Sequence, residues 1–236
     1  MKRSTERILT THTGSLPRPS DLTTMLEDLD TGTAPDPAAF ETRVRRAVAD
    51  VVHQQLDAGI DVVSDGEQGK VGYSTYVRHR LTGFGGQSAG RPRADWADFP
   101  EAAARGERRS TVLRPACNGP IDWKDRTAVQ KDVANLRAAL DGVQPAEAFM
   151  TAASPGVIAH FLPNQHYPSR EAYLARLVDV NARNSRNAPG AKVSLSMDFS
   201  DYDRAPMFAL NEVIRQSVRG ADVPMPPPAR GFHFRP

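Results

Sequence analysis

The sequence predicts an α/β protein built around a parallel sheet. Short β-branched or apolar runs end in small and polar residues, and a helical segment follows most of them, which is the pattern of successive βα units. Because such units join their strands by right-handed crossovers, we expect the runs to lie side by side in one parallel sheet. The five runs are residues 8–13, 61–65, 111–117, 147–152 and 193–198.

Helices are expected between these strands. A first helix has apolar residues spaced three to five positions apart, so they share one face, and Gly59 ends it as a C-cap. Its apolar positions are Phe40, Val44, Ala47, Val51 and Leu56. A second helix carries Val129, Val133, Leu136 and Leu140 at helical spacing and stops at Gly142. A third is expected from about residue 169 to residue 187.

The composition indicates a globular protein that acts on small molecules. The 236 residues are 39% hydrophobic and 25% charged, and we expect one domain over residues 1–220. With 30 basic and 28 acidic residues spread along the chain, no charge field favours nucleic acid or a membrane as partner. Residues 85–109 are Gly- and charge-rich and predict either a lid or a passive insertion. Residues 221–236 form a proline-rich tail.

The single cysteine, Cys117, excludes an internal disulfide framework and any zinc site built from several cysteines of one chain. The N-terminus has no apolar run of signal-peptide length, and no stretch approaches the roughly 20 apolar residues of a membrane span. These features predict a cytoplasmic protein. The oligomeric state stays open.

Small and acidic residues follow the predicted strands, where a ligand site of an α/β protein would be built. Gly14 and Ser15 leave the first strand, where they could hold a carboxylate or phosphate, or only form a turn before the next helix. Asp65 and Glu67 flank a glycine at the end of the second strand. They could bind an amine or act as a base, or they could only form a solvated acidic turn. Asp198 closes the fifth strand and either faces the same rim or caps the next segment.

The residues that follow the strand predicted at 147–152 are explained by helix capping alone. Ser154 is expected to be an N-cap with Pro155 at the first helical position.

Four segments together resemble the stand-alone branch of the cobalamin-independent methionine synthase superfamily, which includes epoxyalkane:coenzyme M transferase. They are TTHTGSLPRP, DVVSDGEQGKVGYSTYVRHRLTGF, ACNGPI and FMTAASPGVIAHFLPNQHYPSREAYL. Each motif is weak alone, and their order and spacing make the resemblance specific. It is strong to about Leu174 and faint from there through Asp198 to the end.

The resemblance implies a (β/α)8 TIM-barrel fold, incomplete at its C-terminal end because five strands are visible where a closed barrel needs eight. It also implies a zinc-dependent thiol alkyl- or methyltransferase. In such an enzyme zinc lowers the pKa of a bound thiol such as homocysteine, and methyltetrahydrofolate polyglutamate is the methyl donor.

The resemblance assigns roles to particular residues. Gly14 and Ser15 match the segment that holds the carboxylate of homocysteine, and Glu67 matches the carboxylate that binds its amino group. Asp198 matches a second acidic group near that amine and is the catalytic candidate. His12 and Asp65 are expected in the same pocket, without an assigned role.

The metal ligands are where this sequence departs from the family. The family's ligands begin with a His-x-Cys pair, and only His233 matches it here, because Arg235 stands at the cysteine position and the sequence ends at Pro236. We therefore expect a methionine synthase-like protein impaired by C-terminal truncation. The alternatives are epoxyalkane:coenzyme M transferase-like alkylation, or a non-catalytic binding protein or fragment that keeps only the amino-acid pocket.

Overall fold

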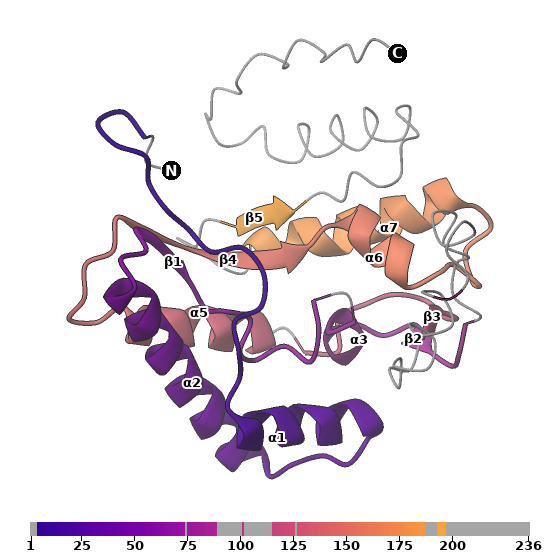
Figure 1. The fold of residues 1–236 in the computed structure, drawn as a ribbon. Coiled ribbons are helices and arrows are strands. Elements are labelled where there is room, and N and C mark those ends of the chain that lie inside the picture. Colours follow the sequence, from indigo (N-terminus) through magenta and orange to yellow (C-terminus); the bar gives the residue numbers. More distant parts are fainter. Residues whose placement is uncertain are drawn as a thin grey trace. The chain divides into compact units, whose positions relative to one another are not determined.

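The computed structural model describes residues 4–73, 75–88, 101, 115–125, 127–186 and 193–196. All of them belong to one unit of the chain, Met1–Tyr202. They form a mixed α/β fold in which helices pack around a small parallel sheet (Figure 1). The α/β class predicted from the sequence is therefore confirmed.

The parallel sheet has the strand order β1-β4-β5, with bounds Val62–Ser64, Glu147–Ala153 and Val193–Ser196. Both pairings are parallel, with Val62 opposite Glu147 and Met150 opposite Val193. The first predicted strand contributes a single parallel bridge, from Thr11 to Val62. Since Val62 pairs with β4 as well, the chain around Thr11 follows the other edge of β1. Four of the five predicted runs thus contribute to one parallel arrangement.

The predicted placement of residues 111–117 in this sheet is wrong. Within that run the structure describes residues 115–117, and β3 (Ala116–Cys117) pairs antiparallel with β2 (Phe84–Gly85). The backbone is closely packed next to this pair, because a Cβ atom added at Gly83 would lie 2.5 Å from the carbonyl oxygen of Gly119. β4 takes the position beside β1 instead. Of residues 85–109, predicted as a lid or insertion, the structure describes 85–88 and 101, and Gly85 belongs to β2.

One hydrophobic core lies between β1 and helices α1 (Ser20–Thr31), α2 (Pro37–Asp57) and α5 (Thr127–Ala139). Helix α2 starts at a cap in which the Asp36 side chain accepts a hydrogen bond from the amide of Ala39. Gly59 follows its end with a left-handed φ of 77°, as predicted. Buried members of this core are Leu22, Leu26, Val44, Ala47, Val48, Val52, Val63, Leu136 and Ala139.

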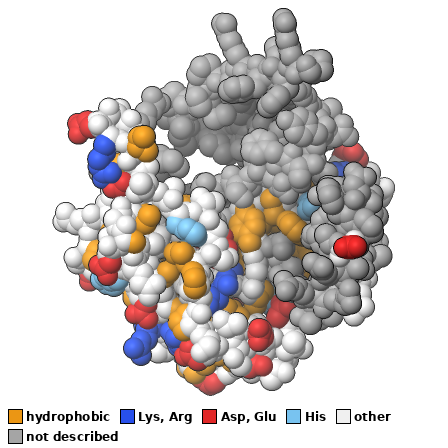
Figure 2. Space-filling model, in the orientation of Figure 1, with side chains coloured by type: hydrophobic (Ala, Val, Ile, Leu, Met, Phe, Trp, Pro, Cys, Tyr) orange, Lys and Arg blue, Asp and Glu red, His pale blue; other side chains and the backbone are white. Residues whose placement is uncertain are grey.

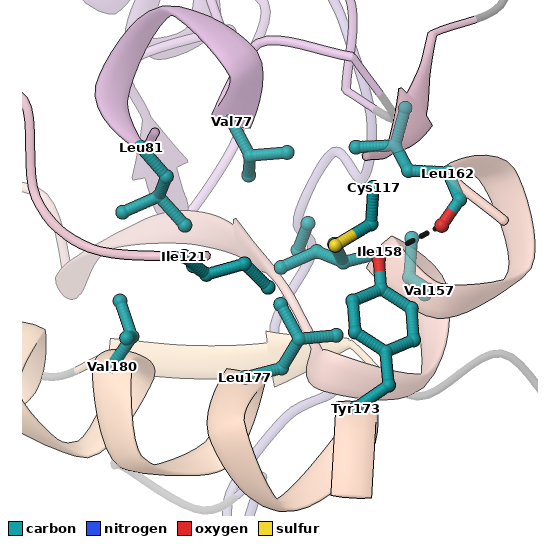
Figure 3. Close-up of a cluster of buried hydrophobic side chains, with 11 residues drawn as sticks. Val77, Leu81, Cys117, Ile121, Val157, Ile158, Leu162, Tyr173, Leu177 and Val180 are labelled. Atoms are coloured by element: carbon teal, nitrogen blue, oxygen red, sulfur yellow. Dashed lines mark hydrogen bonds between the residues drawn. The ribbon is translucent and has the colours of Figure 1, made fainter. Parts of the chain in front are cut away.

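A second core joins α3 (Val77–Arg80), β3, α6 (Pro155–Phe161) and α7 (Arg170–Arg186), as shown in Figure 3. Within it, the Tyr173 hydroxyl donates a 2.8 Å hydrogen bond to the carbonyl of Leu162. The predicted cap of α6 is confirmed, because Ser154 Oγ accepts from the amide of Val157 and Pro155 is the first helical residue. Helix α7 matches the helix predicted at residues 169–187.

Acidic and basic side chains are interspersed on the face drawn in Figure 2, with apolar groups between them. This agrees with the balanced charge of the sequence. None of the helices in the described part of the chain has the length and apolar character needed to cross a bilayer.

Candidate functional site

The carboxyl ends of β1, β4 and the segment around Thr11 meet at one rim of the parallel sheet. Three polar side chains converge at this rim. Ser15 Oγ donates to Glu67 Oε2 at 2.5 Å, and Thr151 Oγ1 donates to Glu67 Oε1 at 2.9 Å. Glu67 is only 2% exposed, whereas Ser15 is exposed. The buried carboxylate is therefore held by one hydroxyl on each oxygen, and the Ser15 side faces solvent.

The turn after β1 aims Glu67 at this rim through an unusual backbone. Gly66 and Glu67 have φ values of 58° and 57°, both in the left-handed region. A non-glycine residue there costs about 1 kcal/mol or more, so the surrounding contacts must stabilise Glu67 in this conformation. One such contact is the hydrogen bond from the amide of Leu16 to the carbonyl of Gly66. Strained residues of this kind cluster at ligand sites.

A buried ion pair lies directly behind Glu67. Lys70 Nζ is 3.6 Å from Asp65 Oδ2, and these side chains are 3% and 8% exposed. Burial raises the pKa of the Asp65 carboxyl, and the Lys70 ammonium opposes that rise. Burial alone would lower the pKa of Lys70, but Asp65 and the neighbouring groups outweigh it and the pKa is raised. Lys70 thus stays protonated at neutral pH.

Arg18 ties the first segment to the same turn. Its Nη2 donates to the carbonyls of Glu67 and Lys70 at 2.8 and 2.9 Å. Gln68, which is fully buried, donates from its side chain to the carbonyl of Leu16. The loop that carries Ser15 and the turn that carries Glu67 are therefore fixed to each other by backbone and side-chain bonds.

The structure brings together only some of the residues predicted from the sequence. Ser15 and Glu67 are in direct contact, and Asp65 lies behind them as the partner of Lys70. Gly14 has a left-handed φ of 99° just before Ser15. His12 is half-buried, and its Nε2 atom has no hydrogen-bond partner among the described residues. Asp198 and His233 lie outside the described residues.

Three residues of the cluster were missed in the sequence. Thr151 lies near the end of a predicted strand, so the reasoning that selected Glu67 could have selected it too. Lys70 and Arg18 are within the motifs, but nothing in their spacing predicts that they bind backbone carbonyls. These bonds depend on how the loop that carries Ser15, the turn that carries Glu67 and strand β4 pack together in three dimensions.

The described residues do not fit a zinc site. No group of three or more His, Cys, Asp or Glu side chains among them could hold a metal ion. Cys117 is buried, and burial raises the pKa of its thiol to about 11, which disfavours the thiolate that binds zinc. No chemical step is therefore assigned to zinc from these residues.

Comparison with known proteins gives one family match. The model of the cobalamin-independent synthase catalytic domain matches residues 8–91, which contain Ser15, Glu67 and Lys70. A 5-methyltetrahydropteroyltriglutamate–homocysteine methyltransferase from Streptomyces avermitilis is 37% identical over 75 residues, or 32% of this chain and 10% of that protein. The chain thus matches about a tenth of that relative's length.

Two solved structures share the fold. A B12-independent methionine synthase from Shewanella sp. W3-18-1, in complex with selenomethionine, has a TM-score of 0.64 and 21% identity over 90% of this chain and 58% of its own. A candidate vitamin B12-independent methionine synthase from Listeria monocytogenes has a TM-score of 0.54 and 13% identity, covering 90% of this chain and 63% of its own. At such identities the likeness is one of fold, and this chain spans less than two thirds of either structure.

Proposed function

We propose that this chain, whose residues 8–91 match the model of the cobalamin-independent synthase catalytic domain, binds the amino-acid end of homocysteine or a similar thiol. The proposed binding site is the rim formed by Ser15, Glu67 and Thr151. On this proposal the strands β1, β4 and β5 are successive strands of a (β/α)8-type barrel, whose ligand sites lie at the carboxyl ends of the strands. The methyl donor proposed is the one in the Streptomyces relative's name, methyltetrahydropteroyltriglutamate.

The observation that carries the proposal is the environment of the Glu67 carboxylate. Each of its oxygens accepts from one hydroxyl, so lone pairs remain for further donors. Among the described residues, no lysine, arginine or histidine nitrogen lies within 4.0 Å of it, whereas Asp65 is paired with Lys70. A ligand ammonium would supply a direct ion pair and a charge-assisted hydrogen bond.

The same carboxylate argues against the coenzyme M alternative. Coenzyme M carries an anionic sulfonate and no amine, so Glu67 would repel it. An amino-acid thiol matches the charge of the site better.

Other family roles remain proposals. Gly14 and Ser15 would lie near the ligand carboxylate, and Asp198 near its amine. His233, which lies outside the described residues, is the one residue of this chain proposed as a zinc ligand, and a zinc ion held there would lower the pKa of a bound thiol. A cytoplasmic location is proposed from the lone cysteine and the homocysteine substrate.

Glu67→Gln tests the binding proposal, because it keeps the size of the side chain and removes its charge. We expect L-homocysteine to bind more weakly by about 1–3 kcal/mol, the value of a hydrogen bond to a charged group. Calorimetry measures the affinity. Mercaptobutanoate keeps the thiol and carboxylate of homocysteine but lacks its amino group, so its affinity should not fall.

Glu41→Gln is the matched control. Glu41 is a half-exposed glutamate on α2 whose ion pair is with Lys131 and not with a residue of the rim. It should leave both affinities unchanged. Equal affinity of wild type and Glu67→Gln for homocysteine would remove Glu67 from the site.

A further inference from the structure

We propose that Lys70 is a positioning residue that fixes the Glu67 carboxylate in its ligand-binding orientation by holding Asp65 and Thr151. This inference rests on the proposed function, because the ligand assigned to Glu67 comes from there. Lys70 itself would not touch the ligand.

The contacts of Lys70 form a closed ring with those of Glu67. Lys70 Nζ donates to the carbonyl of Thr151 at 2.8 Å and lies 3.6 Å from Asp65 Oδ2. The same two residues contact Glu67, since Thr151 Oγ1 donates to its Oε1 at 2.9 Å and the Glu67 amide donates to Asp65 Oδ1 at 3.1 Å. One ammonium thus orients both the backbone and the carboxylate of Glu67.

The ring joins two strands where their regular pairing ends. The β1–β4 ladder ends with Ser64 opposite Phe149, two residues before Thr151. Beyond that point side chains of the following loop bind β4 instead. Lys70 reaches the carbonyl of Thr151, Tyr73 Oη donates to the carbonyl of Ala152, and the amide of Ala153 donates to Tyr76 Oη. Of these three side chains, Lys70 is the one that contacts a residue bonded to the Glu67 carboxylate.

Charge balance supports the same role. Two carboxylates, Asp65 and Glu67, are buried at the rim, and two unpaired charges would be costly there. Lys70 compensates Asp65 and also lies 5.5 Å from the centre of the Tyr76 ring, a favourable position for a cation. Arg18 acts electrostatically on both carboxylates, but its guanidinium donates to the backbone carbonyls of Glu67 and Lys70. Among the described residues, the Glu67 carboxylate therefore keeps room for a direct cationic partner.

The test is a double-mutant cycle of Lys70→Met and Glu67→Gln in the full chain, with L-homocysteine affinity measured by calorimetry. We expect Lys70→Met to weaken binding about tenfold or more, and Lys70→Arg to recover most of it because a cation returns to the ring. In the Glu67→Gln background, Lys70→Met should have little further effect, since a residue that acts through Glu67 cannot act once its charge is gone. Lys131→Met, at an exposed lysine paired with Glu41, is the matched control and should bind like the wild type.

A second readout does not depend on the ligand. In protein labelled with carboxyl ¹³C-glutamate, the Glu67 resonance is assigned by its loss in Glu67→Gln. Lys70→Met should shift this resonance while the thermal unfolding curve stays cooperative, and Lys131→Met should not.

The outcomes separate the two proposals. Unchanged affinity in Lys70→Met, or losses that add in the double variant, would overturn the positioning role. If the wild type does not bind homocysteine but the Glu67 resonance shifts in Lys70→Met, the ligand assignment fails and the positioning role stands. If that resonance stays in place, the positioning role fails whatever the ligand.

Discussion

Ser15 Oγ lies 2.5 Å from Glu67 Oε2, although the two residues are 52 positions apart in the chain. The contact follows from the parallel bridge between Thr11 and Val62, which brings the carboxyl ends of both segments to one edge of the sheet. Each segment continues for a few residues past that bridge before its polar side chain meets that of the other segment. The pair therefore depends on strand direction, and an antiparallel arrangement would have separated it.

The two hydroxyls on Glu67 should contribute differently to stability. Thr151→Val keeps the shape of the side chain but removes the donor to the buried Oε1 atom, and we expect a loss of about 1–3 kcal/mol in the free energy of unfolding. Ser15→Ala removes the donor on the exposed side, where water can replace it, so we expect a loss within about 0.5 kcal/mol. Urea denaturation measures both.

Thr11→Val is the control, because it makes the same exchange of a hydroxyl for a methyl group at an exposed threonine. The Thr11 hydroxyl donates to the carbonyl of Val62. An equal loss in Ser15→Ala and Thr151→Val would mean that water does not reach the Ser15 side of the carboxylate.

The convergence of Ser15 and Glu67 could be predicted from the sequence because it depends on local signals. Each residue follows an apolar run, and the chain length between the runs holds a helix, so a parallel crossover brings both ends to one edge. The bonds of Lys70 could not be predicted. They depend on how far a flexible side chain reaches across to β4, which no periodicity encodes.

The failed strand prediction has a similar cause. Residues 111–117 read as a strand because they hold an apolar run, but an apolar run does not specify its partner. The partner of Ala116 and Cys117 is the short segment at Phe84 and Gly85, and the close approach of Gly83 to Gly119 fixes this pairing. The pattern of apolar residues identifies buried strands and leaves their neighbours undetermined.

Gly66→Ala should destabilise the turn that aims Glu67. The residue has a left-handed φ of 58°, and an added Cβ would lie 3.1 Å from Leu16 Cβ and 3.2 Å from both Cγ atoms of Val51. The backbone cost is about 1 kcal/mol, and crowding against the loop and α2 should raise the total to about 2–4 kcal/mol. Urea denaturation measures the loss, and homocysteine affinity should fall with it.

Gly142→Ala separates the two contributions. Gly142 also has a left-handed φ, 76°, but no atom lies within 4 Å of the added Cβ, so only the backbone cost of about 1 kcal/mol applies. Equal losses in the two variants would show that crowding at Leu16 and Val51 is absorbed without strain.

Cys117 should react slowly with thiol reagents in the folded protein. Burial raises the pKa of its thiol to about 11, and a smaller contribution from the Gly119 backbone lowers it. A raised pKa means that the thiolate, which is the reactive form, is scarce below that pH. At pH 8 only about one thiol in a thousand would be ionised. The side chain also lies within the second core, between Tyr173 and Leu162 (Figure 3).

The measurement is the rate of reaction with a chromogenic disulfide, in native buffer and in urea, with Cys117→Ser as the blank. Since the chain has one cysteine, the whole signal reports this position. We expect the native rate at pH 8 to be slower than the unfolded rate by about 100-fold or more, and to rise with pH up to about 11 while the fold holds. In urea the rise should level off near the ordinary thiol pKa of about 8.5, because burial is lost. A native rate close to the unfolded one would show that reagent and solvent reach Cys117, and the close packing of β3 against α6 and α7 would then be wrong.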